Sequence, residues 1–128
     1  MIPKTDQVCS LEYAKRLKEL GVKQDSYFTY LVNNINGLHC VDLFSQDVWV
    51  MPAKNAISYA AYTVAELGIM LGKRFDTGMG EDKWVCRYFE KDTDKIHHAI
   101  ADTEADARAK MLIYLIENSH AKVEDINK

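Results

Sequence analysis

An alanine-rich segment that runs into large aliphatic residues, DTEADARAKMLIYLIEN at 102–118, most constrains the fold of this chain. Thr103 can act as an N-cap, and Asp106 stands where the acid of a capping box would be. Apolar residues then recur at helical spacing in one stripe, made of Ala105, Ala109, Leu112, Ile113 and Ile116. The pattern predicts a helix that buries one face and lies close to a sheet, so we interpret the segment as scaffold.

Two further segments carry helix signals. In CSLEYAKRLKELGV, Ser10 can cap the first turn, and Gly21 supplies the left-handed backbone that ends a helix. In YTVAELGIMLG, Thr63 and Glu66 have the spacing of a capping box. Gly68 inside this second segment costs about 1 kcal/mol against alanine, which either weakens the helix prediction or indicates close packing.

An Asn-Gly pair at 36–37 stands between two runs of β-forming residues, in SYFTYLVNNINGLHCVDLF. A type I′ turn needs positive φ at both central residues, and Asn-Gly meets that need well. If this turn sets the register, Val32 lies opposite Val41 and Tyr30 lies opposite Leu43. The expected core face of the hairpin then carries Phe28, Tyr30, Val32, Val41 and Leu43.

The remaining chain predicts a second hairpin, WVCRYFE and KIHHAIA joined by KDTD, with the face of Trp84 left open. KRFDTGMGEDK is expected to be a polar loop. SQDVWVMPAKNAISYAA is expected to be strand plus loop, with a strand at Val48–Met51 that Pro52 interrupts. The predicted fold is one α+β domain, an antiparallel sheet of two hairpins with about three helices in the order α-β-β-α-β-β-α. The domain spans 1–128, with flexible tails at 1–8 and 119–128.

Composition supports one ordinary globular domain. The 128 residues are 48% hydrophobic and 27% charged, whereas disorder calls for fewer apolar residues and a larger net charge. A net charge of −3 argues against nucleic acid as the main partner. Three cysteines without close spacing favour a reduced chain. With neither a signal-peptide pattern nor a long apolar run, we expect a cytoplasmic protein without a membrane partner.

Several motifs resemble known chemistry without meeting its requirements. FDTGM contains the Asp-Thr-Gly of aspartic proteases, but Asp76 would need a second aspartate from another copy. GIMLGKR departs from a phosphate loop in its glycine spacing and in the residue after its lysine. His97 and His98 are adjacent, so on a strand they point to opposite faces and cannot hold one metal ion together. A metal site would need ligands from distant segments, and we expect no catalytic, metal or cofactor site.

Two loops offer candidates for a binding surface. Trp49 and Met51 lie in VWVMP, a segment with weak structural signals, where apolar side chains can be exposed. Lys73, Arg74 and Phe75 follow the second predicted helix and could meet an anion. A thiol nucleophile is a further alternative, because the second hairpin brings Cys86 near the adjacent histidines, although a buried cysteine is more often a small hydrophobe.

Three blocks of the sequence together resemble a known group of proteins. The blocks are VCSLEYAKRLKELGVKQDSYF, YTVAELGIMLG and ADTEADARAKMLIYLIEN. They are similar, in the same order, to small proteins of bacteriophages, prophages and gut bacterial genomes. The resemblance covers somewhat under half of the chain and implies a shared fold and a bacterial host cell, without assigning catalytic residues.

Phage proteins of this size that lack a catalytic motif often act by binding. The resemblance therefore implies a non-catalytic accessory protein that binds a host or phage protein, or a nucleotide, and that self-associates. One alternative is an anti-defence protein that sequesters a signalling nucleotide, with Lys73, Arg74 or Arg87 on the phosphate and an aromatic ring on the base. Another alternative is a small hydrolase that uses Asp76 or Cys86.

Overall fold

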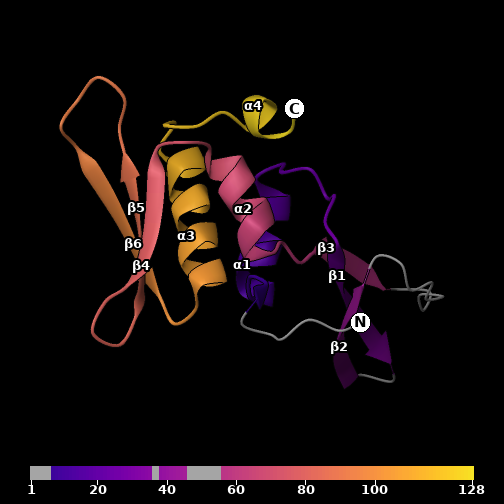
Figure 1. Ribbon diagram of the computed structural model, residues 1–128. Helices are drawn as coiled ribbons and strands as arrows, with labels where there is room; N and C mark the ends of the chain where they lie inside the picture. The colour runs from indigo at the N-terminus through magenta and orange to yellow at the C-terminus, as the bar shows by residue number, and fades with distance from the viewer. Residues whose placement is uncertain (1–6, 36–37, 46–55) are drawn as a thin grey trace.

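The computed structural model describes residues 7–35, 38–45 and 56–128. Its elements are, in chain order, α1 (Leu11–Glu19), β1 (Phe28–Ile35), β2 (Leu38–Ser45), β3 (Ile57–Ala60), α2 (Val64–Leu71), β4 (Phe75–Met79), β5 (Trp84–Phe89), β6 (Ile96–Ala101), α3 (Glu104–Glu117) and α4 (Val123–Ile126). Figure 1 shows α3 in the middle, with the strands β4, β5 and β6 on one side of it and α1 and α2 on the other. The predicted α+β fold is confirmed.

The described strands form two separate antiparallel sheets of three strands, where the sequence predicts one sheet. Their orders are β2-β1-β3 and β4-β5-β6. In the first sheet Val32 pairs with Val41 and Tyr30 pairs with Leu43, as predicted, although the Asn-Gly turn itself lies outside the described residues. Tyr30 and Val32 are buried and Val41 is exposed, so only part of the expected core face is core.

Each predicted hairpin gains a third strand. β4 forms within the segment predicted to be a polar loop, and it pairs with β5. The loop prediction is wrong because Asp76 and Gly78 leave this strand without apolar alternation, and pairing with its neighbour makes it a strand. β3 forms in the segment expected to be strand plus loop and pairs with β1. The strand expected at Val48–Met51 lies outside the described residues.

The predicted signals at the end of α1 and the start of α2 are confirmed. Gly21 has a φ of +92°, and the Val22 N–H donates to the Leu17 carbonyl at 3.0 Å, which is the longer bond of a Schellman motif. Thr63 and Glu66 make both hydrogen bonds of a capping box. Both helices therefore have ends that the local sequence encodes.

The start of α3 joins that helix to α1. The Thr103 hydroxyl accepts from the Asp106 N–H at 3.1 Å, as predicted for an N-cap. The Asp106 carboxylate does not complete a capping box and instead accepts from the Ser10 N–H at 2.6 Å. The Ser10 side chain makes no capping bond, so that prediction is wrong. A residue from the far end of the chain thus occupies the first turn of α1.

α3 is buried on more sides than the single predicted stripe. It packs between the sheet β4–β5–β6 and the helices α1 and α2, so residues off the stripe also lose solvent (Figure 1). Its buried residues are Ala105, Ala107, Ala109, Met111, Leu112, Ile113 and Leu115. The alanines face close neighbours on several sides, which lets the backbone of α3 approach both layers.

The sheet β4–β5–β6 has one face toward α3 and one face toward solvent. The register pairs Thr77 with Cys86 and Cys86 with Ala99, and this row is on the helix side, where Cys86 is fully buried. Trp84 shares that side, which settles the face that its loop length left open. The next row, on the opposite face, consists of Asp76, Arg87 and His98.

The segment 119–128, for which we expect a tail, folds back against the rest of the chain. It contains the short helix α4. The Asn127 amide donates to the Gly21 carbonyl at 3.0 Å, and its oxygen accepts from the Lys23 N–H at 2.7 Å. The segment therefore lies against the end of α1.

Candidate metal centre

Glu90, His97 and His120 come together from three places in the chain. Glu90 directly follows β5, and its N–H donates to the Lys95 carbonyl at 3.1 Å across the connection to β6. His97 lies on β6 opposite Tyr88, on the helix-facing side of the sheet. The hairpin therefore places one carboxylate and one imidazole beside the end of α3.

The end of α3 brings in the second histidine. Ser119 has a φ of +61°, and the His120 N–H donates to the Leu115 carbonyl at 2.8 Å. The Ser119 N–H donates to the Ile116 carbonyl at 3.2 Å, which completes a Schellman motif. This motif reverses the chain after α3 and turns His120 toward the β5–β6 hairpin.

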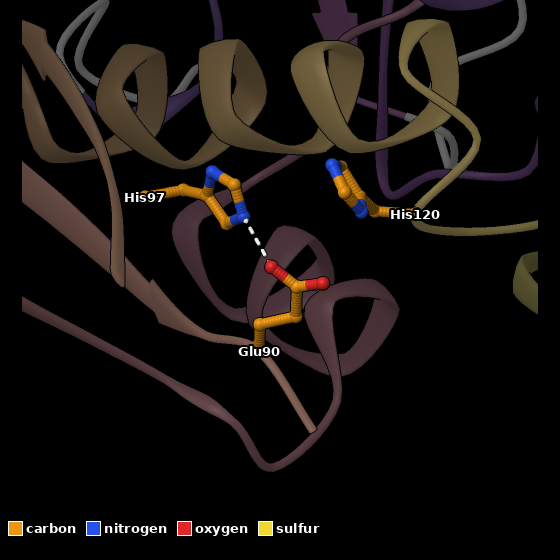
Figure 2. Close-up of side chains that lie close together, drawn as sticks. All are labelled: Glu90, His97 and His120. Carbon is orange, nitrogen blue, oxygen red and sulfur yellow. Dashed lines mark hydrogen bonds and ion pairs between the residues drawn. The ribbon is translucent and has the colours of Figure 1, made fainter. Parts of the chain in front are cut away.

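The three side chains lie close enough to share an ion. Figure 2 shows the Glu90 carboxylate and the two imidazole rings facing a common region beside α3. The His97 Nε2 lies 3.1 Å from the Glu90 Oε2, and one ligand atom from each of the three residues lies within 4.8 Å of the others. Ligand atoms around a tetrahedral zinc ion are about 3.3 Å apart, so the exposed His120 ring has a short distance to close.

Tyr114 of α3 fixes the orientation of His97. Its hydroxyl lies 3.2 Å from the His97 Nδ1, while the Nε2 of the same ring faces Glu90. Histidines that bind metal ions commonly hold the other ring nitrogen on a hydrogen-bond partner, which fixes the tautomer. The side chains of His97 and Glu90 are 15% and 25% exposed, so the pair is shielded while His120 is open to solvent.

The sequence predicts one part of this arrangement. His97 and His98 do lie on opposite faces, with His98 exposed opposite Arg87. The partners of His97 are instead Glu90 and His120, which are 7 and 23 residues away in the chain. No spacing rule marks them, because a hairpin and a helix end must both fold before the three side chains meet.

The residues predicted for a binding surface are only partly described. Trp49 and Met51 lie outside the described residues. Lys73 and Arg74 are exposed in the turn between α2 and β4. Phe75 is half-buried beneath Arg108, whose guanidinium lies 4.8 Å from the ring centre. Phe75 thus packs inside the fold, and the two cations project from its edge.

The two residues considered for hydrolysis are held in structural roles. Burial raises the pKa of the Cys86 thiol to about 12, and a thiol with such a pKa supplies almost no nucleophilic thiolate near neutral pH. Asp76 accepts two hydrogen bonds from Arg87, at 2.8 and 2.6 Å, and this pairing lowers the pKa of its carboxyl. Its ordinary partner in a proteolytic pair would be a second aspartate.

A groove of about 580 Å³ beside α1 bears on the nucleotide alternative. It contains cations and one aromatic ring, but it also contains acids, and its lining is Leu11, Glu12, Tyr13, Lys15, Arg16, Glu19 and Ile113. Arg16 donates to Glu19 at 3.1 Å and to Glu117 at 2.8 Å. A phosphate would have to displace these carboxylates, so the groove is poorly suited to a nucleotide.

Comparison with known proteins found no matching family model, no similar curated protein and no similar solved structure. No helix in the described part of the chain is long and apolar enough to cross a membrane. Functional argument for this chain therefore starts from the side-chain arrangement around Glu90, His97 and His120.

Proposed function

We propose that this chain is a small non-catalytic binding module that holds one divalent transition-metal ion, with Zn²⁺ as the first candidate. One observation carries the proposal: Glu90, His97 and His120 present three ligand atoms within 4.8 Å of one another. The Tyr114 hydroxyl, 3.2 Å from the His97 Nδ1, supports it as the partner of the nitrogen that would not bind the ion.

The ligand types favour zinc over the common hard cations. Two imidazole nitrogens and one carboxylate oxygen form a set that suits Zn²⁺, whereas Mg²⁺ and Ca²⁺ are bound mostly by oxygen atoms. Three protein ligands leave a fourth position on the ion for water or for a group from a partner. The site would therefore bind a metal ion and could present it to a second molecule.

The resemblance to small phage proteins supports an accessory role in the bacterial host cell. We place binding ahead of hydrolysis because Cys86 is buried and Asp76 is occupied by Arg87. We place it ahead of nucleotide sequestration because the cation in the groove beside α1 is already paired with carboxylates. Native mass spectrometry of protein purified from infected cells would report a retained metal ion or nucleotide in one measurement.

A calorimetric titration with zinc chloride tests the proposal. We expect one Zn²⁺ per wild-type chain, and we expect His97→Ala and His120→Ala to abolish this binding. His98→Ala is the matched control, because His98 is the adjacent residue on the opposite face of β6. Binding should also weaken as the buffer is acidified, since imidazole must be deprotonated to bind a metal ion.

Two results would overturn the proposal. One is a wild-type chain that takes up no zinc at neutral pH. The other is loss of zinc binding in the His98 variant to the same extent as in the His97 variant. Melting temperatures without metal should match among the variants, and added zinc should raise the melting temperature only where the site is intact.

A further inference from the structure

The face of the sheet β4–β5–β6 that points away from α3 is open. Figure 1 shows α3 on one side of this sheet and no described helix or strand on the other. Ile96 and Ile100 of β6 are each about half exposed there, at 45% and 51%, and Val85 and Phe89 of β5 share their face. We call this surface the outer face. It combines apolar side chains with one charged row.

The charged row is self-complementary. Arg87 of β5 and Asp76 of β4 are paired across neighbouring strands, with the Arg87 Nη2 2.6 Å from the Asp76 Oδ2. Consider a two-fold axis parallel to the strands and between β4 and β5, with two copies face to face. Each Asp76 then stands opposite the Arg87 of the other copy, and the two ion pairs merge into a network of four charges.

The same axis matches the rows on either side of the charges. Val85 pairs with Gly78 in the sheet, so in the paired copies each Val85 stands over the other copy's Gly78. A Cβ atom built at Gly78 would meet nothing within 4 Å, so this position is a shallow gap that an aliphatic side chain can fill. On the other side, Phe89 stands over Arg74, a cation and a ring that attract each other.

We propose that the outer face binds a second copy of this chain to form a two-fold homodimer. Three matches support this occupant together: carboxylate to guanidinium, valine to glycine, and aromatic ring to cation. A partner with a different sequence would need all three complements in the same register. The bulky isoleucines of β6 border the interface and extend its apolar area.

Charge reversal with mixing tests the homodimer. Size-exclusion chromatography with light scattering should give twice the chain mass for the wild type across a dilution series. Asp76→Arg places like charges on both sides of the interface, as does Arg87→Asp, so each variant alone should be monomeric. When the two variants are mixed, opposite charges face each other between the copies, and the dimer should return as a heterodimer.

The mixing step separates the interface from the internal ion pair. Within each single variant the internal pair is repulsive, and mixing does not change that, so recovery of the dimer can come only from contacts between copies. A wild type that is monomeric at every concentration overturns the proposal. So does a dimer that survives both single substitutions, or one that mixing fails to restore while both variants keep their circular dichroism spectrum.

Discussion

Arg108 sets the distance between α2, α3 and β4. Its Nη1 donates to the Val64 carbonyl at 2.8 Å, and its Nη2 donates to the Thr77 hydroxyl at 3.1 Å and to Glu104 at 3.2 Å. The guanidinium is thus bound to two helices and a strand at once. A cation this shielded needs such partners, because an unpaired charge in the same place would be costly.

Gly68 is the counterpart of that arginine. A Cβ atom at this position would lie 2.5 Å from the Arg108 Nη1 and 3.3 Å from the Phe75 Cζ. The close packing that the sequence offers as one explanation of this glycine is therefore present. Because the far end of Arg108 is held by several hydrogen bonds, it cannot yield without losing some of them.

We expect Gly68→Ala to destabilise the fold. The gain in helix propensity is about 1 kcal/mol. Displacing Arg108 should cost more, since hydrogen bonds to charged groups contribute roughly 1.5 to 3 kcal/mol each. The measurement is the urea midpoint, with Ile69→Ala, an exposed position on the same helix, as the control. A higher midpoint for Gly68→Ala would show that Arg108 moves aside freely.

At the scale of elements, the joint between α1 and α3 depends on a half-buried carboxyl. Burial is the main cause that raises the pKa of Asp106 above its ordinary value of 3.8, although the hydrogen bond from Ser10 opposes it. A carboxyl whose pKa is raised by folding favours the folded state in its protonated form. Its contribution to stability is fully present below the unfolded-state pKa and is lost as the pH rises through the folded-state pKa.

Asp106→Asn should remove this pH dependence. The amide oxygen can still accept from the Ser10 N–H, and the variant has no charge to desolvate. We expect the melting temperature of the wild type, relative to the variant, to fall as the pH is raised from about 3 to about 6, and to be level above that range. A constant difference across the whole range would contradict a raised pKa.

Elements with signals inside their own segment could be predicted from the sequence. The Schellman end at Gly21 and the capping box at Thr63 depend only on neighbours in the chain. β4 could not be predicted, because Asp76 and Gly78 become strand residues only through pairing with β5. Ser10 was misread for a related reason: its partner is a side chain 96 residues away.

The candidate metal site could not be predicted for the same reason at a larger scale. Strand alternation correctly separates His97 from His98. The position of His120 depends on the left-handed Ser119, a conformation that sequence rules assign to glycine or asparagine. Pairing Glu90 with both histidines needs the three-dimensional arrangement of β5, β6 and α3.

In the whole molecule, the two sheets are supported unequally. The sheet β4–β5–β6 is covered along one face by α3, while β2 is an edge strand whose only described neighbour is β1. Local opening should therefore be easier in β2 than in β5, which is the central strand of its sheet.

Native-state hydrogen exchange can measure this difference. We expect the amides of Val41 and Leu43 in β2 to exchange faster than those of Cys86 and Tyr88 in β5. Heat or mild denaturant should widen the gap before global unfolding begins. Equal protection in the two strands would mean that the two sheets open as a single cooperative unit.

The bonds between α1 and α3 also determine when the N-terminal part of the chain can finish folding. Residues 75–117 form a continuous run of three strands and a helix with contacts near in sequence, whereas Ser10 and Arg16 wait for Asp106 and Glu117. Contacts between neighbours form early, and those across long loops form late. On the ribosome, α1 is synthesised first but is docked last, after nearly the whole chain has been translated.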